Sequence, residues 1–444
     1  MNRVVLRSIT LCFLLLLAIA PALGQEAAEA VTVVDAYGEA VVIEDTSRII
    51  TIGGSVTEIV FELGAGDQVI ARDDSSLYPP QIHALESVGY VRRLSAEPVL
   101  ALNPTLIITT EDAGPPEAIE QLRAAGVPLL VVPSEDSIEG VINKVETIAQ
   151  ALGREDAGGE IVARIQADYV AAQDLQKQLT THPRVMFIYA RGAGAVSVAG
   201  MNTSASTMIA LAGGENAVTE FEGYQPITAE AVVTAAPDVI LMMSRGLESL
   251  GGVEGLLEQP GIAQTPAGQN GRIVAVDDLY LLGFSTRIGT AILDLTYLIH
   301  EEFEPPLLTL LRADGRFYTL LKAIDTAGQT NLLSRDGDYT LFAPTDEAFT
   351  TLPEGMLDGL MSSTISLQAV LSYHILDGRY TADDLAARNG DSVQTLYVDG
   401  KLTITTTENG ILLNDSAAII ESDRIAANGI LHVVDALLLP ERPQ

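Results

Sequence analysis

The sequence predicts an α/β fold with two parallel-sheet lobes joined by one long helix, followed by a separate α+β domain. Residues 46–153 and 183–302 alternate short apolar strands with helical patterns, which is typical of a parallel sheet with helices on its faces. Residues 154–182, between these segments, carry no strand signal. After Pro305-Pro306 the composition changes, and residues 307–440 combine helical and period-two patterns.

The first lobe is expected over residues 46–153. A helix from Val56 to Leu63 follows the first strand and ends at Gly64, and a second helix covers Pro116–Ala125. Four short apolar runs are the predicted strands of this lobe: Ile49–Ile52, a run that begins at Val69-Ile70, Leu106–Ile108 and Leu129–Val132. Their order along the chain predicts helices that cross over between parallel strands.

The predicted connection between the lobes is a single helix of more than 20 residues within 154–182. Ala, Gln, Leu and charged residues recur there at helical spacing, with no glycine after Gly159. The second lobe then repeats the pattern of the first. Its predicted strands are Val185–Tyr189, Val239–Met242 and Ile273–Val276, and its predicted helices are Thr203–Leu211 and Thr286–Ile299.

An internal repeat also indicates two similar lobes. Leu94–Val99 leads through Asn103-Pro104 into one strand, and Ile227–Val232 leads through Pro237-Asp238 into another. In both units a residue with a hydroxyl group is followed by Ala, Glu, an apolar helix, Pro and a strand. Two lobes with a cleft between them form an architecture suited to trapping a ligand.

The C-terminal domain is expected over residues 307–440. Its first segment, 307–324, is predicted to be helical and amphipathic, and Tyr339–Pro344 is predicted to be a strand that runs into a turn. Two later stretches, Leu402–Thr405 and Ile430–Val434, alternate with the period of a strand.

Residues 1–24 are predicted to be a cleaved signal peptide. Arg3 and Arg7 precede the apolar run Leu11–Ala20, and Ala22 and Gly24 supply small residues for cleavage before position 25. The alternative is a membrane anchor, but the run is short for a bilayer span, which needs about 20 residues. We therefore expect a periplasmic, extracellular or cell-surface location.

Cys12 is the only cysteine, and it lies inside the apolar run without a lipobox before it. A lipid-anchored protein is therefore not expected. Once residues 1–24 are removed no cysteine is left, which excludes disulfides, thiolate metal sites and cysteine nucleophiles. The formal net charge of −34 repels phosphate backbones, so nucleic acid is not an expected partner.

Residues 46–302 resemble the helix-linked (class III) periplasmic substrate-binding proteins of ABC importers. The resemblance is to the haem-binding type above all, through the Gly-Gly-Ser, Leu-Tyr-Pro-Pro and Asp-Ala-Gly-Pro stretches. The stretches that carry it are Arg48–Ser55 with Thr57-Glu58, Tyr78-Pro79-Pro80, Gly89-Tyr90, Leu94–Glu97, Asp112–Pro115 and Leu211–Asn216. The resemblance implies capture of a ligand between the lobes and delivery to a membrane permease.

Residues 307–440 resemble a fasciclin (FAS1) domain. The stretch Thr340–Phe349 matches the first signature of that family, Tyr373-His374 its central pair, and Gly429–Asp435 its second signature. The resemblance implies interaction with a cell-surface or matrix partner and no catalysis.

Tyr78 is the principal candidate for a ligand contact. It follows a predicted strand and precedes Pro79-Pro80, which places it on a stiffened loop at the carboxyl end of a strand, where ligands collect in open α/β sheets. The resemblance implies that Tyr78 is an axial ligand of ferric haem, and a phenolate suits Fe(III). The alternative is a loop tyrosine that packs on a proline.

Three other residues are candidates for the ligand site. Arg245 follows the strand Val239–Met242 and is predicted to pair with the Tyr78 phenolate or with a haem propionate, because guanidinium groups match carboxylate geometry. Arg92 is a weaker propionate candidate, and Tyr224 is expected to line the cleft. For each of them a solvated or packing role stays open.

Glu97 and Glu230 occupy equivalent places in the two repeats. The resemblance implies that one exposed glutamate in each lobe docks onto arginines of the permease. The local alternative is that each acidic side chain favours the dipole of a helix that begins after a Ser or Thr cap.

A bare transition-metal site is not expected, because His83, His182, His300, His374 and His432 form no cluster in the sequence. There is no nucleophile elbow, phosphate loop or catalytic carboxylate pair, so we expect no enzyme. The leading hypothesis is a haem-delivering binding protein. Cobalamin or a ferric siderophore as cargo, or a mainly adhesive fasciclin protein, are the alternatives.

Overall fold

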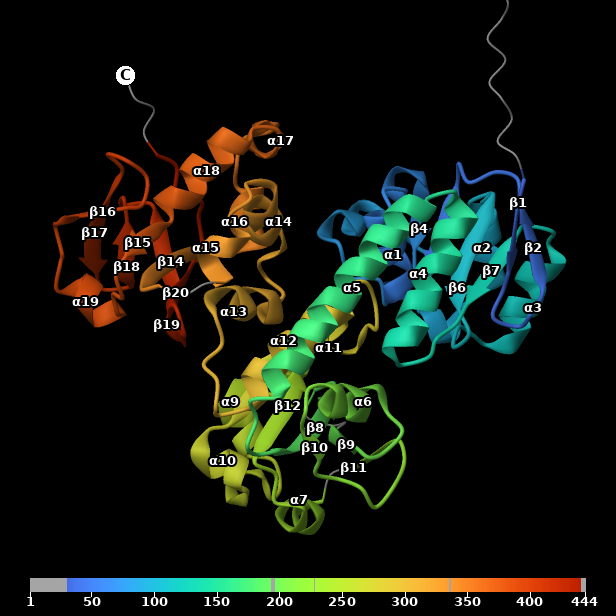
Figure 1. Cartoon of the computed structure of the whole chain (residues 1–444), viewed down its shortest axis with the longest axis horizontal. Helices are drawn as coiled ribbons and strands as arrows, with labels where there is room; N and C mark the ends of the chain where they lie inside the picture. The colour runs from blue at the N-terminus through green and yellow to red at the C-terminus, as the bar shows by residue number, and fades with distance from the viewer. Residues whose placement is uncertain (1–29, 193–195, 227, 335–336, 441–444) are drawn as a thin grey trace, which may run out of the picture.

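The structure is a computed structural model that describes residues 30–192, 196–226, 228–334 and 337–440. The predicted signal peptide and Cys12 lie outside the described residues. Figure 1 shows three bodies: a first lobe, a second lobe, and a C-terminal domain beside them, with the long helix α5 running between the lobes. No helix in the described part of the chain is both long and apolar enough to cross a bilayer.

The first lobe has a five-stranded sheet of order β5-β4-β3-β6-β7, in which all neighbouring strands are parallel. Its strands are β3 (Ile49–Ile52), β4 (Val69–Arg72), β5 (Glu86–Ser87), β6 (Leu106–Thr110) and β7 (Leu129–Val132). Its helices are α1 (Gly54–Glu62), α2 (Ala96–Ala101), α3 (Pro116–Ala124), α4 (Ile138–Leu152) and the 3-10 turns η1 (Gly66–Gln68), η2 (Pro80–Ala84) and η3 (Val91–Arg93). A hairpin of β1 (Val31–Val34) and β2 (Ala40–Ile43) precedes the sheet.

Every residue of strands β3, β6 and β7 is buried. Burial on both faces explains why their sequences are continuous apolar runs and do not alternate. The hairpin β1–β2 and helix α4 were not assigned from the sequence, although Ser137 caps α4 and Gly153 ends it in a left-handed conformation.

Helix α5 (Glu155–Gln176) joins the two lobes. Helix α12 (Ile288–Ile299) packs along it. At their crossing Gly289 is required, because a Cβ there would lie 2.5 Å from the carbonyl oxygen of Ile165. The close approach of these two helices makes the connection between the lobes a packed helix pair and not an isolated rod.

The second lobe has a sheet of order β11-β9-β8-β12-β13, with β10 paired to β8. The three predicted strands, β8, β12 and β13, are parallel, and the unpredicted β10 is parallel to β8. Strands β9 and β11 add two antiparallel pairings at one edge. The strands are β8 (Arg184–Ala190), β9 (Val196–Ala199), β10 (Glu215–Asn216), β11 (Tyr224–Pro226), β12 (Val239–Met243) and β13 (Ile273–Val276). The helices besides α12 are α6 (Ser204–Leu211), α7 (Ala229–Ala235), α8 (Ser244–Ser249), α9 (Gly252–Leu257), η4 (Ile262–Gln264), α10 (Pro266–Asn270) and α11 (Asp278–Leu282).

The C-terminal domain is built around a seven-stranded sheet of order β15-β14-β20-β19-β18-β17-β16, in which only β14 and β20 are parallel neighbours. Its strands are β14 (Tyr339–Pro344), β15 (Ile375–Asp377), β16 (Ser392–Gln394), β17 (Lys401–Thr407), β18 (Gly410–Leu413), β19 (Ala417–Ala426) and β20 (Gly429–Val434). Its helices are α13 (Leu307–Asp314), α14 (Tyr318–Thr326), α15 (Thr330–Ser334), α16 (Asp346–Thr350), α17 (Met356–Met361), α18 (Thr364–Tyr373) and α19 (Ala382–Ala386). The predicted α/β class, with two lobes, a long helix and an α+β domain, is confirmed.

The helical segment expected over 307–324 is two helices and not one. It breaks at Gly315, whose φ of +85° is the left-handed conformation that ends α13. Gly315 also has no room for a side chain, because a Cβ there would lie 2.7 Å from a carboxylate oxygen of Asp277 in the second lobe. The break therefore sets both the turn into α14 and the close approach of the domain to the second lobe.

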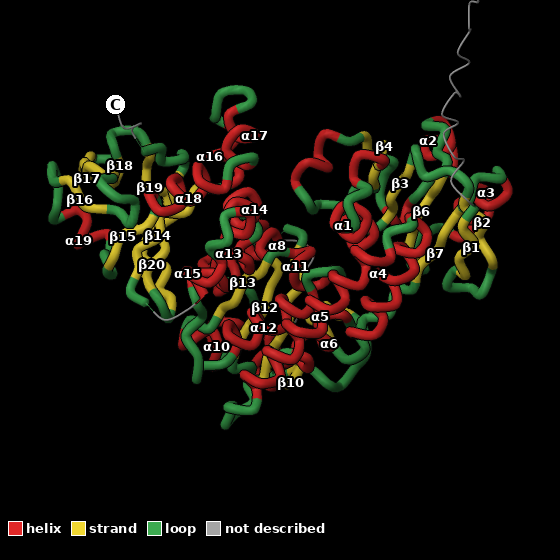
Figure 2. The backbone as a smooth tube through the Cα atoms, turned by 45° about the horizontal axis from the view of Figure 1, so that its top comes forward, coloured by secondary structure: helices red, strands yellow, loops and turns green. Residues whose placement is uncertain are grey.

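Asp294 on α12 fixes α13 to the second lobe. Its carboxylate is 1% exposed and accepts two hydrogen bonds from Arg312, at 2.6 and 2.7 Å, and one from Thr309, at 2.6 Å. The hydroxyl of Tyr280 donates a fourth, at 2.6 Å. A bidentate guanidinium pair with both carboxylate oxygens satisfied makes this contact directional. Figure 2 shows α12 and α13 close to each other at the junction of the bodies.

We predict that Asp294→Asn lowers the free energy of unfolding by about 3 kcal/mol, because it leaves Arg312 poorly compensated in a mostly buried place. Urea unfolding followed by circular dichroism measures the loss. The matched control is Asp325→Asn, an exposed aspartate on α14, which should unfold like the wild type. Equal midpoints for Asp294→Asn and the control would contradict the stabilising role of the Asp294–Arg312 pair.

Candidate functional site

Tyr78 lies on the loop between β4 and η2, and a buried aspartate holds this loop in shape. The Asp73 carboxylate accepts hydrogen bonds from the backbone N–H of Gly53, at 2.9 Å, and of Ser75, at 2.8 Å. The hydroxyl of Ser76 donates a third, at 2.7 Å. Asp73 itself is fully buried. The loop at the carboxyl ends of β3 and β4 is therefore fixed by its own polar contacts, and Tyr78 projects from a defined backbone.

The ring of Tyr78 is enclosed by two side chains from distant parts of the chain. The guanidinium carbon of Arg287 lies 3.7 Å from the ring centroid, a cation–π arrangement. The ring of Tyr318, on α14 of the C-terminal domain, meets it edge-on with the centroids 4.9 Å apart. Burial raises the pKa of the Tyr78 phenol, and the charge of Arg287 opposes that rise. The phenol is therefore protonated at neutral pH in this structure.

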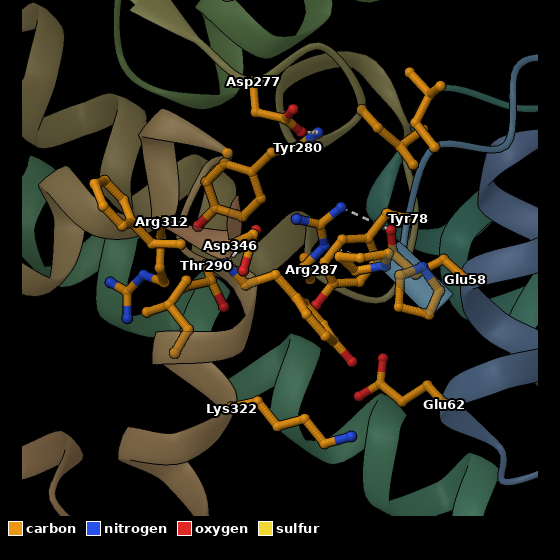
Figure 3. Close-up of a pocket in the computed structure, with 18 of the residues that line it drawn as sticks. Glu58, Glu62, Tyr78, Asp277, Tyr280, Arg287, Thr290, Arg312, Lys322 and Asp346 are labelled. Atoms are coloured by element: carbon orange, nitrogen blue, oxygen red, sulfur yellow. Dashed lines mark hydrogen bonds and ion pairs between the residues drawn. The ribbon is translucent and has the colours of Figure 1, made fainter. Parts of the chain in front are cut away.

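Arg287 is held by Glu58, which lies on α1 of the first lobe. The guanidinium donates from Nε and Nη2 to the two carboxylate oxygens at 2.9 and 2.8 Å, and Thr286 donates to the same carboxylate at 2.9 Å. Glu58 is 1% exposed. Since Arg287 precedes α12 and Glu58 belongs to α1, this bidentate pair links the two lobes directly beneath Tyr78 (Figure 3).

These residues line a cavity of about 680 Å³. The volume is in the usual range for small-molecule sites. All three bodies contribute to its walls: Glu62, Tyr78 and His83 from the first lobe; Arg245, Asp277 and Arg287 from the second; Arg312, Tyr318 and Lys322 from the C-terminal domain. Figure 3 shows Glu62, Tyr78, Arg287 and Lys322 arranged around this space.

The cavity has five cationic side chains in its walls, and they differ in how they are compensated. Arg287 pairs with Glu58, Arg312 with Asp294 and Arg164 with Glu62. Arg245 and Lys322 also line the cavity and make no ion pair within the described part of the chain. An anionic group of a ligand could therefore pair with Arg245 or Lys322 without displacing a carboxylate of the protein.

The predicted site residues divide between two places. Arg245, exposed on α8, lines the same cavity as Tyr78. Tyr224 and Arg92 do not line it. Tyr224 lies beside Tyr189, with ring centroids 5.8 Å apart, and Arg92 pairs with Asp112 at 3.1 Å. Burial raises the pKa of the Tyr224 phenol, Asp136 raises it further, and the charge of Arg92 opposes the rise.

Two residues at Tyr78 were missed by the sequence reasoning. The cation over the phenol ring is Arg287 and not the predicted Arg245. Tyr318 lies 240 positions from Tyr78, in what was expected to be an independent domain. No local signal marks either residue. Arg287 stands at the start of a predicted helix, where a solvent-exposed arginine would look the same in the sequence.

Glu97 and Glu230 are exposed in the first turns of α2 and α7. Thr228 caps α7 by accepting a hydrogen bond from the N–H of Ala231, at 3.3 Å, whereas Ser95 at the matching position of α2 makes no side-chain cap. The two glutamates therefore share position and exposure, although only one helix has the expected cap. A role in docking remains a prediction.

The histidines have structural roles where they are buried. In the described residues no group of three or more His, Cys, Asp or Glu side chains could hold a metal ion. His374 donates from Nδ1 to the carbonyl of Val370 at 2.8 Å and accepts at Nε2 from the N–H of Leu438 at 3.0 Å. His432 bonds the carbonyl of Tyr380 at 2.8 Å. His83 is exposed on η2 at the rim of the cavity.

Residues 49–280 match the periplasmic binding protein family, and since this is more than half of the chain, the protein belongs to that family. Among solved structures, the chain is similar to the periplasmic heme-binding protein RhuT from Roseiflexus sp. RS-1 in its apo form. The two are 47% identical with a TM-score of 0.56, and the match covers 57% of this chain and 98% of that one. The vitamin B12-binding protein of Vibrio campbellii is 28% identical over 206 residues, 46% of this chain and 73% of its own.

The C-terminal part is a fasciclin domain, matched over residues 315–440. A protein of Synechocystis sp., sll1735, is 35% identical to this part over 136 residues, which is 30% of this chain and 98% of that protein. Both predicted resemblances are thereby confirmed, and substrate-binding proteins of ABC transporters are ligand carriers without enzymatic activity.

We predict that the fasciclin domain loses stability as the pH falls from 7 to 5. Burial lowers the pKa of His374 to about 4, while a histidine in the unfolded chain has a pKa of about 6.5. The unfolded state therefore binds a proton first, and stability present above pH 6.5 declines by about 2 kcal/mol at pH 5. Protonation at Nε2 would also break the bond from Leu438.

Urea unfolding at pH 7 and pH 5 measures this loss. His374→Leu should be less stable at pH 7, since it leaves the Leu438 N–H unpaired, and should lose less on acidification. His182→Leu, a change at an exposed histidine, is the matched control and should keep the wild-type pH dependence. The same pH dependence in His374→Leu and wild type would contradict the assignment.

Proposed function

We propose that this protein captures haem in the cavity at Tyr78 and delivers it to the permease of an ABC importer. The observation that carries the proposal is the Tyr78 phenol on a rigid loop, aimed at a cavity of about 680 Å³ with the Arg287 guanidinium over its ring. The 47% identity to a heme-binding protein supports haem as the cargo. A phenolate is an established axial ligand of ferric haem.

The chemistry of Tyr78 as a ligand requires loss of its proton. Burial raises its pKa, so the free site holds a neutral phenol, and the ferric iron of the cargo is the charge that favours the phenolate. Arg287 opposes the rise in pKa and would stabilise the phenolate once the iron is present. Arg245, without an ion-pair partner among the described residues, is the candidate partner of a propionate carboxylate.

The second group, Tyr224 with Arg92, is proposed to contact the ligand only where it extends between the lobes. Neither residue lines the Tyr78 cavity, so their proposed contribution to binding is smaller. The fasciclin domain is proposed, in addition, to bind a cell-surface or matrix partner.

We predict that Tyr78→Phe weakens haem binding at least about 100-fold, because it removes the iron ligand and nothing else. Titration of the full chain with ferric haem, followed by absorbance, should give saturable binding with a tyrosinate-type high-spin spectrum in the wild type and not in the variant. Tyr37→Phe, a change at an exposed tyrosine of the first lobe, is the matched control.

Other outcomes of this titration overturn parts of the proposal. Haem binding that is equal in Tyr78→Phe would remove Tyr78 as the ligand. The absence of saturable haem binding would overturn haem as cargo, and saturable binding of cyanocobalamin by the same protein would replace it, in line with the vitamin B12-binding relative. A ferric siderophore is the remaining alternative, with Tyr78 as a wall residue in both cases.

We predict that the paired charge reversal Glu97→Arg with Glu230→Arg abolishes haem-dependent growth of the native cell and leaves haem binding by the purified protein unchanged. Both side chains are exposed in first turns of helices on different lobes, which suits contact with two halves of a permease. The matched control reverses Glu117 and Glu254, which are exposed in the first turns of α3 and α9. Equal growth of the two double variants would contradict docking through Glu97 and Glu230.

A further inference from the structure

The fasciclin domain takes part in the cavity at Tyr78, which a separate adhesion module would not do. Arg312 on α13, and Tyr318 and Lys322 on α14, line the same cavity as Tyr78 and Arg287. The match to the heme-binding structure covers 98% of that chain but only 57% of this one, so the fasciclin domain has no counterpart in it. This chain therefore adds a wall that its relative lacks.

The position of this wall is fixed by contacts with the second lobe. The Asp294–Arg312 pair is buried, and the backbone N–H of Asp277 donates to the carbonyl of Ala313 at 2.7 Å. Gly315 packs against the side chain of Asp277 so closely that no Cβ fits there. These contacts lie at the end of α13 and in the turn that follows it, so they hold the start of α14 beside the cavity.

Tyr318 is placed by the fasciclin domain itself. The carboxylate of Asp346, in the first fasciclin signature, accepts from the backbone N–H groups of Tyr318, at 3.1 Å, and Thr319, at 2.7 Å. It thereby satisfies two of the free N–H groups at the start of α14. Burial raises the pKa of the Tyr318 phenol, and the side chain of Gln81 in the first lobe opposes that rise. Tyr318 contacts the Tyr78 loop through the ring of Tyr78.

We propose that the fasciclin domain is the third wall of the ligand site: the ring of Tyr318 packs against the bound ligand beside Tyr78, and Lys322 pairs with an anionic group of that ligand. The inference rests on the proposed function, because haem offers both features: a flat apolar macrocycle and two carboxylates. An aromatic ring held at a fixed angle favours a planar partner. Lys322 is exposed on α14 and has no ion pair in the part of the chain that the structure describes.

The opposite role for the same contact is a plug, in which Tyr318 occupies the place of the ligand and hinders its entry. The volume of the cavity favours the role of a wall. A space of about 680 Å³ remains open with Tyr318 already in contact with Tyr78, so the contact does not fill the site. The two roles predict opposite signs: removing a wall weakens binding, and removing a plug strengthens it.

The test uses haem titrations of the full chain at low and high salt. Tyr318→Ala is expected to bind haem roughly five- to tenfold more weakly, from the loss of an aromatic contact, and Tyr318→Phe is expected to bind like the wild type. Lys322→Met is expected to bind about threefold more weakly at low salt and equally at high salt, because a surface ion pair is screened. Ile365→Ala and Lys401→Met, exposed in the same domain, are the matched controls.

If haem binding by both Tyr318→Ala and Lys322→Met is unchanged or tighter, the fasciclin domain is not a wall of the ligand site. Loss of haem binding in Tyr78→Phe would still support the proposed function in that case. No saturable haem binding by the wild type would overturn the proposed function and this inference together. Since Lys322 is exposed, Lys322→Met keeps the test valid if Tyr318→Ala does not fold, which thermal unfolding detects.

Discussion

The ion pair between Glu58 and Arg287 is the interaction on which the site depends. It joins α1 of the first lobe to the start of α12, and it places a cation 3.7 Å from the ring centre of Tyr78. Both charges are satisfied by two hydrogen bonds between them, which offsets much of the cost of burying them. The lobes are therefore tied together beside Tyr78, and the long helix α5 is not their only link.

A second buried pair, Asp294 with Arg312, extends this frame to the fasciclin domain. Both arginines flank Tyr280: the hydroxyl of Tyr280 donates to Asp294, and Arg287 lies over its ring at 5.1 Å. The two pairs thus share one aromatic side chain. The orientation of the fasciclin domain and the packing around Tyr78 are coupled through these five residues, because a shift of α12 would disturb both pairs.

Those parts of the structure that depend on neighbouring residues can be predicted from the sequence. The buried strands are continuous apolar runs, and Tyr78 follows a strand and precedes two prolines, so the lobes and the Tyr78 loop follow from short-range patterns. The residues around Tyr78 do not follow from such patterns, because Glu58 and Arg287 are 229 positions apart and meet only through the packing of the two lobes. The break at Gly315 could not be predicted for the same reason, because the residue that Gly315 packs against, Asp277, lies in the second lobe.

The electrostatics of the site bear on the proposal that the buried Tyr78 is an iron ligand. An isolated buried phenolate would be costly, and burial raises the pKa of Tyr78, so its phenol is neutral. Arg287 is meanwhile neutralised by Glu58 and leaves no unpaired cation. In the proposed complex, the charge of ferric iron would compensate the phenolate that forms. Neither state contains an uncompensated buried charge, and a third wall that excludes water would strengthen the iron–phenolate attraction.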